Sequence, residues 1–214
     1  MKIYHGSKEI LKEPKYKGSN EYNDYGPCFY VTTNKQDASI WACKHDSVGF
    51  VNEYELNINN LKILDLTDKS KYSVLNWIAI LAKFRNFEYS FEKLNRPRID
   101  KLIEKYFIDI DDFDLIIGYR ADDAYFRFPK GFISGNLSVE DLEEVFKLGN
   151  FGIQYALVSE KAIKRIKFVS AKLASKEDIG KYHSQVLEAT SLFDRILYKS
   201  VNSYSGTRIG DLLK

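Results

Sequence analysis

The sequence has little cysteine, histidine and proline, and each shortage excludes a class of protein. Two cysteines in 214 residues are too few for a disulfide framework, and three histidines show no zinc-ligand spacing. We therefore expect free thiols and no metal. With four prolines and no glycine- or serine-rich stretch, nothing marks a flexible linker between independent domains.

Long apolar runs and an excess of charge of one sign are also missing. No stretch approaches the ~18 apolar residues that a membrane helix needs, so we expect no membrane partner. The first residues lack the apolar segment of a secretion signal, and we expect a cytoplasmic protein. The formal net charge of +2 gives no general attraction to nucleic acid.

What is present is a chain of 44% hydrophobic residues whose apolar patterns predict an α+β protein with a mixed or antiparallel sheet. Strands are expected at residues 2–4, 28–32, 49–57, 61–66, 113–118, 153–158 and 163–169. Helices are expected at residues 35–44, 73–85, 98–107 and 138–148, with Asn34 and Ser138 as N-caps. The last two strands are expected to pair with each other.

The expected organisation is one domain over residues 1–170 with a helical insertion at about 70–110. Residues 171–214 differ in pattern, with helical periodicity over 176–198 and a polar, glycine-containing end. We interpret them as a C-terminal helical appendage.

The first candidate motif is Ile3-Tyr4-His5-Gly6-Ser7, at the end of the first expected strand. A strand end can present both an imidazole and the open peptide groups of a glycine to a ligand. On its own, this fragment is more typical of a structural histidine, so a second motif is needed.

The second motif is Gly26-Pro27-Cys28-Phe29-Tyr30-Val31-Thr32, before a helix that contains Ala38 and Ala42. With His5-Gly6-Ser7 before it and residues 152–158 after it, the chain resembles the ADP-ribosyltransferase superfamily. The resemblance is to its diphtheria-toxin and poly(ADP-ribose)-polymerase-like branch, which has a His, Tyr, Glu pattern. More narrowly, residues 4–169, about four-fifths of the chain, look like a little-characterised bacterial domain family grouped with these transferases.

The resemblance implies the split mixed or antiparallel sheet of these enzymes and an ADP-ribosyltransferase, a glycosyltransferase that acts on NAD. In that family the histidine bonds a hydroxyl of adenosine or ribose, the glycine backbone holds the nicotinamide carboxamide, and a tyrosine stacks on the nicotinamide ring. The corresponding residues here are His5, Gly6 and Tyr30. The NAD-binding residues that the resemblance implies are His5, Gly6, Ser7, Tyr25, Tyr30, Thr32 and Arg120.

The third position of the pattern departs from the family, since Gln154 stands where the resemblance implies a glutamate. An amide can hold a ribose hydroxyl but brings no negative charge to the cationic sugar. Three interpretations follow: Asp122 or, preferably, Asp123 restores the charge; the protein hydrolyses NAD; or it is an inactive module that binds NAD or ADP-ribose. The expected catalytic residues are therefore Gln154, His5, Tyr30 and Asp123.

Two interpretations remain open for several candidate site residues. Arg120 either clamps the NAD pyrophosphate or pairs with the neighbouring aspartates, and Asp122 equally suits a helix cap. We expect Cys28 to be a buried, inert thiol. The acidic run over residues 109–114 lacks the glycine of a calcium loop and is expected to be a solvated turn.

The partners implied are NAD and a macromolecular acceptor. A basic stretch with Lys161, Lys164, Arg165, Lys167 and Lys172 suits either a nucleic-acid groove or a solvated face, and a protein acceptor is equally compatible. A small NAD-consuming enzyme resembles the toxin of a toxin–antitoxin or phage-defence pair. A neutralising antitoxin protein is then a further expected partner.

Overall fold

The structure is a computed structural model that describes residues 1–121, 125–147 and 152–213. It is an α+β fold, as the apolar patterns predict. The chain forms two compact units, which we describe separately. The first consists of Met1–Asp65, Ile110–Gly118 and Ile153–Gln185, and the second of Leu66–Asp109, Tyr119–Gly152 and Val186–Lys214. The sequence-based division at residue 170 stays a prediction.

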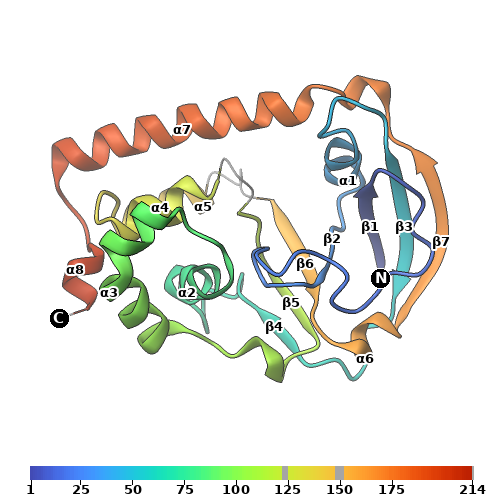
Figure 1. The fold of residues 1–214 in the computed structure, drawn as a ribbon, viewed down its shortest axis with the longest axis horizontal. Helices are drawn as coiled ribbons and strands as arrows, with labels where there is room; N and C mark the ends of the chain where they lie inside the picture. Colours follow the sequence, from blue (N-terminus) through green and yellow to red (C-terminus); the bar gives the residue numbers. More distant parts are fainter. Residues whose placement is uncertain (122–124, 148–151, 214) are drawn as a thin grey trace. The chain divides into compact units, whose positions relative to one another are not determined.

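The first unit contains an antiparallel sheet with the strand order β1-β3-β7 (Figure 1). Its strands are β1 (Lys2–Ser7), β3 (Phe50–Leu56) and β7 (Ile166–Leu173). Strand β1 extends beyond the expected residue 4, so His5, Gly6 and Ser7 belong to the strand itself. His5 is paired with Asn52 of β3.

The second sheet of this unit is mixed, with the order β2-β6-β5-β4. Its strands are β2 (Phe29–Val31), β6 (Ile153–Leu157), β5 (Leu115–Tyr119) and β4 (Ile63–Asp65). Strands β2 and β6 are antiparallel, whereas β4 and β5 are parallel. A single bridge between Tyr4 and Thr32 joins β1 to β2 and so links the two sheets.

The strand-to-helix unit predicted after residue 28 is confirmed. Helix α1 (Lys35–Ala42) begins at Asn34, whose side chain accepts a hydrogen bond from the Gln36 N–H, as an N-cap does. The helix packs against β1 and β3. It therefore lies directly beside the strand that carries the first motif.

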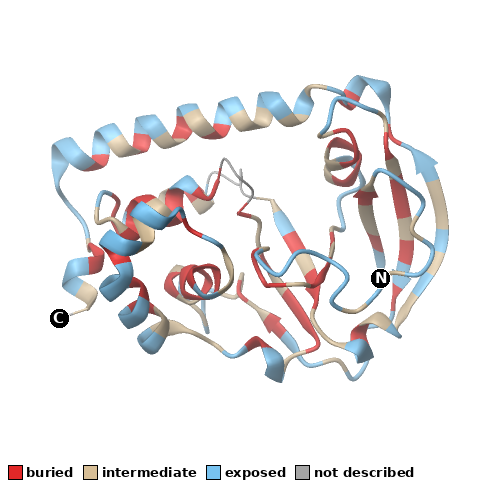
Figure 2. Cartoon of the chain, viewed as in Figure 1, coloured by how far each residue is buried: buried red, intermediate tan, exposed pale blue. Residues whose placement is uncertain are grey.

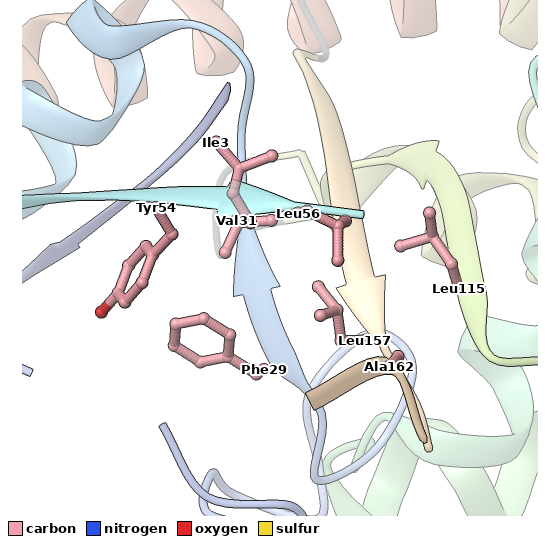
Figure 3. Packing of buried hydrophobic residues seen from close by; sticks show 8 residues of the cluster. All are labelled: Ile3, Phe29, Val31, Tyr54, Leu56, Leu115, Leu157 and Ala162. Atoms are coloured by element: carbon pink, nitrogen blue, oxygen red, sulfur yellow. The ribbon is translucent and has the colours of Figure 1, made fainter. Parts of the chain in front are cut away.

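Apolar side chains from both sheets form one core cluster (Figure 3). Its fully or almost fully buried members are Ile3, Phe29, Val31, Tyr54, Leu56, Leu115, Leu157 and Ala162. Burying one such large side chain contributes about 1.5–3 kcal/mol to folding. In Figure 2 the buried positions of the strands run along this core. Packing in this cluster fixes the positions of β1, β2 and β6 relative to one another.

The expected pairing of the last two strands is wrong. Strand β6 pairs with β2, and β7 pairs with β3 of the other sheet. The reason lies between them, where α6 (Glu160–Ile163) replaces the expected turn. Ser159 caps this helix by accepting a hydrogen bond from the Ala162 N–H at 3.0 Å. The helical turn carries the chain from one sheet to the other.

The second unit is helical over its described residues. Its helices are α2 (Val74–Phe84), α3 (Tyr89–Tyr106), α4 (Arg127–Ile133), α5 (Val139–Lys147), α8 (Ile209–Leu212) and residues 186–203 of α7 (Lys181–Ser203). Helix α2 buries most of its surface, as its apolar residues predict. Ser138 caps α5 as expected, since its hydroxyl accepts from the Asp141 N–H at 3.1 Å and Asp141 accepts from the Ser138 N–H at 2.8 Å.

Helix α3 begins at Tyr89, earlier than the expected residue 98, and includes Pro97. The side chain of Arg96 pairs with both Glu92 and Asp100, one turn away on each side. These pairs bracket the proline and support the helix through it. Across the described parts of the chain, no helix combines the length and apolar character needed to span a bilayer.

Candidate functional site

The ring of His5 is half-buried beside β1 and reaches the backbone of β2. Its Nδ1 lies 2.7 Å from the carbonyl oxygen of Tyr30, and its ring lies 4.8 Å from that of Phe29. A carbonyl only accepts, so Nδ1 carries the proton and donates. Burial lowers the pKa of His5, outweighing this hydrogen bond. The imidazole is therefore neutral near pH 7, with Nε2 as an acceptor.

Gly6 is buried beneath α1, and its backbone groups belong to one edge of β1. A Cβ at this position would overlap the Ala38 carbonyl and lie 2.8 Å from the Ala42 nitrogen, so only glycine fits beneath α1. Backbone groups along a strand alternate between its two edges. The Tyr4 N–H donates to the Thr32 carbonyl, and the Tyr4 carbonyl accepts from the Thr32 N–H. The N–H and C=O of Gly6, two residues further along β1, therefore point to the same edge of β1, beyond the bridge.

The hydroxyl of Ser7 is engaged within its own loop. It donates to the Glu9 carbonyl at 2.6 Å and accepts from the Asn52 amide at 2.8 Å. Asn52 is fully buried and also accepts from the Leu11 N–H at 2.9 Å. The sequence reasoning missed Asn52, because nothing in its local pattern distinguishes it from other strand residues. It fixes the chain that follows His5.

Tyr30 is half-buried and anchors the turn that precedes β2. Its hydroxyl donates to the Gly26 carbonyl at 2.7 Å and accepts from the Tyr25 N–H at 2.9 Å. Gly26 has a φ of +74°, which favours glycine, so the turn depends on both residues. These bonds hold the Tyr30 ring in one orientation.

Two further residues, one just before the second motif and one at its end, have structural contacts. Tyr25 is fully buried and stacks on Tyr30, with ring centroids 6.4 Å apart. The NAD-binding role of Tyr25, which the resemblance implies, stays a prediction, and in the structure the residue supports Tyr30. The Thr32 hydroxyl accepts from the Asn34 N–H at 3.0 Å, beside the cap of α1.

Gln154 on β6 is buried beside a carboxylate from the loop before β2. Its Nε2 donates to Oδ2 of Asp24 at 2.7 Å, and the two residues are 9% and 6% exposed. Asp24 lies two residues before the second motif, and the sequence reasoning gave it no role. A local signal for it is lacking, because its partner is 130 residues away along the chain.

The register of β2 and β6 places Tyr30 and Gln154 on one face. Tyr30 is opposite Ala156, and Gln154 precedes Ala156 by two residues, so the side chains of both leave the same side of the sheet. Phe29 leaves the other side, where the His5 ring lies. Tyr30 and Gln154 thus share one side of the sheet, whereas the His5 ring lies on the other side and meets Tyr30 through its backbone carbonyl.

The remaining candidate residues are Asp122, Asp123, Arg120 and Cys28. Asp122 and Asp123 lie outside the described residues, and their expected roles stay predictions. Arg120 belongs to the second unit, where its N–H donates to the Gly152 carbonyl at 3.2 Å. Cys28 is buried as expected, and burial raises the pKa of its thiol to about 12.

The expectation of a solvated acidic turn is wrong for Asp114. This residue is buried, and its carboxylate accepts from Lys161 at 2.8 Å, from Ser159 at 2.7 Å and from the Lys62 N–H at 2.9 Å. Its partners come from separate segments, so the acidic run alone did not reveal it. Within the described residues, no group of three or more histidine, cysteine or acidic side chains is placed to hold a metal ion.

Two lysines of the basic stretch form ion pairs. Lys161 is paired with Asp114 and Lys164 with Glu160. Arg165 and Lys167 line an open hollow of about 610 Å³ with residues at the start of β1 and the end of β3. His5, Tyr30 and Gln154 do not line this hollow. A nucleic-acid acceptor stays a prediction.

Comparison with known proteins gives one family. The model of a family described as "Protein of unknown function (DUF3990)" matches residues 1–168. No curated protein and no solved structure matches the chain. The match covers both sheets almost completely and ends within β7.

Proposed function

The chain belongs to the DUF3990 family, and we propose that it is an ADP-ribosyltransferase-like enzyme that takes NAD as substrate and transfers ADP-ribose to a macromolecular acceptor. The observation that carries the proposal is the hydrogen bond between His5 and the Tyr30 carbonyl. It joins the two motifs of the resemblance, although they are 25 residues apart. The proposed fold is the split sheet of that superfamily.

The residues around this bond fit the two ends of NAD. The neutral His5 ring offers Nε2 as an acceptor for a ribose hydroxyl, and the Gly6 backbone edge offers one donor and one acceptor, the complement of a carboxamide. The Tyr30 ring, held by its hydroxyl, gives a flat face for a nicotinamide ring. Because β1 and β2 pair only at Tyr4 and Thr32, an extended dinucleotide can pass beyond that bridge.

The reaction exchanges one bond at the anomeric carbon. The bond to the nicotinamide nitrogen breaks and its electron pair leaves with nicotinamide, which departs neutral. A hydroxyl or other nucleophile of the acceptor forms the new bond, and its proton goes to solvent. The protein's part is to orient the two rings and to stabilise positive charge on the sugar.

A neutral amide at position 154 favours a second candidate, hydrolysis of NAD with water as the nucleophile. Gln154 offers no net charge to the sugar, and the resemblance links this pattern to members that hydrolyse NAD. A third candidate is a module that binds NAD or ADP-ribose without cleavage. We further propose that the enzyme acts as a toxin or defence effector that an antitoxin protein neutralises.

The test is incubation of the purified protein with adenine-labelled NAD, with and without cell lysate. Label in protein or nucleic acid supports transfer and identifies the acceptor class, whereas free ADP-ribose in both conditions identifies a hydrolase. Intact NAD that still binds the protein identifies the binding module. Absence of both binding and cleavage overturns the proposal. His5→Ala tests the site, and His183→Ala, at an exposed histidine, is the matched control.

A further inference from the structure

The amide of Gln154, which departs from the His, Tyr, Glu pattern, is hydrogen-bonded to a carboxylate. Oδ2 of Asp24 accepts a hydrogen bond from Nε2 of Gln154 at 2.7 Å, and both side chains are buried. Burying a carboxylate is costly unless hydrogen bonds compensate it. A primary amide donates such a bond but carries no positive charge, so it does not neutralise the negative charge of an ionised Asp24.

The hydrogen bond also determines which way the amide points. An amide group has a donor end and an acceptor end, and Asp24 takes the donor end of Gln154. The carbonyl Oε1 is therefore the end directed away from Asp24. This is the atom that can accept a bond from a sugar hydroxyl, and the adjacent carboxylate increases the electron density on it.

Asp24 is held in this position by the same turn that Tyr30 anchors. The residues after Asp24 are the buried Tyr25, whose N–H bonds the Tyr30 hydroxyl, and Gly26, whose carbonyl accepts from it. Burial raises the pKa of Tyr30 well above its usual range, and the charges of Cys28 and Asp24 add to that effect. Asp24, Tyr30 and Gln154 are thus one connected group from two strands and one loop.

We propose that Asp24 and Gln154 together do what one glutamate does in the resembling family. The Gln154 amide faces the ribose, and Asp24 orients it and supplies the negative charge for the cationic sugar. Asp24 is then a positioning residue that acts through Gln154. This inference rests on the proposed function and replaces Asp123 as the source of the charge.

The test is an exchange of the two groups, with nicotinamide release and NAD affinity measured for each variant. We expect Asp24→Asn to slow nicotinamide release about a hundredfold, as loss of a preorganised electrostatic group does. NAD affinity should change less than about threefold, since the lost interaction acts on developing charge. The double variant Asp24→Asn with Gln154→Glu should recover to within about tenfold of wild type, because it restores one amide and one carboxylate.

Each outcome separates this inference from the proposed function. Wild-type protein that neither binds nor cleaves NAD overturns both. If the wild type is active, two results would overturn the role of Asp24 alone. One is an Asp24→Asn variant as fast as wild type, and the other is an exchange variant as slow as Asp24→Asn. If Asp24→Asn does not fold by circular dichroism, the exchange variant decides alone, since it keeps both the charge and the hydrogen bond. Asp112→Asn, at an exposed aspartate, is the control.

Discussion

Gly6 on β1 and Ala38 on α1 are packed so closely that a side chain on Gly6 would overlap the Ala38 carbonyl oxygen. The helix therefore lies against the strand at the residue whose backbone belongs to the proposed NAD site. Glycine at this position admits the helix, and its backbone carries the peptide groups that the proposed NAD site uses. Loss of activity on substitution of Gly6 would not by itself identify a ligand contact.

Gly6→Ala should destabilise the protein by about 1–3 kcal/mol or more, because the clash is with backbone and cannot be relieved by rotating a side chain. Urea denaturation measures the change. Gly210→Ala is the matched control, since a Cβ there meets no atom within 4 Å and alanine favours a helix. Equal stability of the Gly6→Ala and wild-type proteins would contradict the close packing of β1 and α1.

His5 should make stability fall as the pH decreases below about 6.5. Burial lowers its pKa in the folded protein from the ordinary value of 6.5, so the unfolded chain binds the proton first. The His5 contribution is complete above pH 6.5 and is lost as the pH drops toward the folded pKa. In this window, the free energy of unfolding from urea denaturation should depend less steeply on pH for His5→Gln than for wild type. Equal slopes would show that His5 does not titrate differently on folding.

The hydroxyl and the ring of Tyr30 should have separable effects. Tyr30→Phe removes the bonds to Gly26 and Tyr25 and should cost about 1–3 kcal/mol of stability, with NAD affinity changed less than about threefold. Tyr30→Ala also removes the stacking face and should weaken NAD binding about tenfold or more. Calorimetric titration measures the NAD affinity of both variants, with Tyr22→Ala as the control at an exposed tyrosine. Wild-type affinity of Tyr30→Ala would remove the stacking role.

Asp114→Asn should cost about 1–3 kcal/mol of stability, because it disrupts a buried carboxylate that three donors surround. Burial raises the pKa of Asp114, but Lys161, the Lys62 N–H and Ser159 outweigh it and lower the pKa to about 2. Its contribution is therefore present above pH 3.8 and is lost as the pH falls toward 2. Thermal denaturation across that range should show a steeper loss for wild type than for Asp114→Asn.

The Cys28 thiol should resist alkylation in the folded protein. Burial raises its pKa to about 12, and the reactive form of a cysteine is the thiolate. Mass spectrometry after iodoacetamide treatment at about pH 8 should find Cys28 unmodified in native protein and modified in guanidinium chloride. Rapid modification of the native protein would show that the thiol is accessible.

Features that depend on near neighbours in the chain were predictable from the sequence. The strand-to-helix unit with its Asn34 cap, the apolar helix α2 and the Ser138 cap all follow from side chains within a few residues of one another. Periodicity and capping are local properties, so they are visible in the sequence. The two site motifs were visible for the same reason, since each is a short contiguous run.

Only the tertiary structure decided which distant segments meet. It placed β6 and β7 in different sheets, and it buried Asp114 against Lys161 and Asp24 against Gln154. A hydrogen bond between side chains 130 residues apart leaves no trace in local hydrophobic spacing. Whether an acidic residue is buried or solvated depends on the donors that the fold brings to it. The sequence by itself determined the strands, caps and motifs, and the fold determined where negative charge lies beside them.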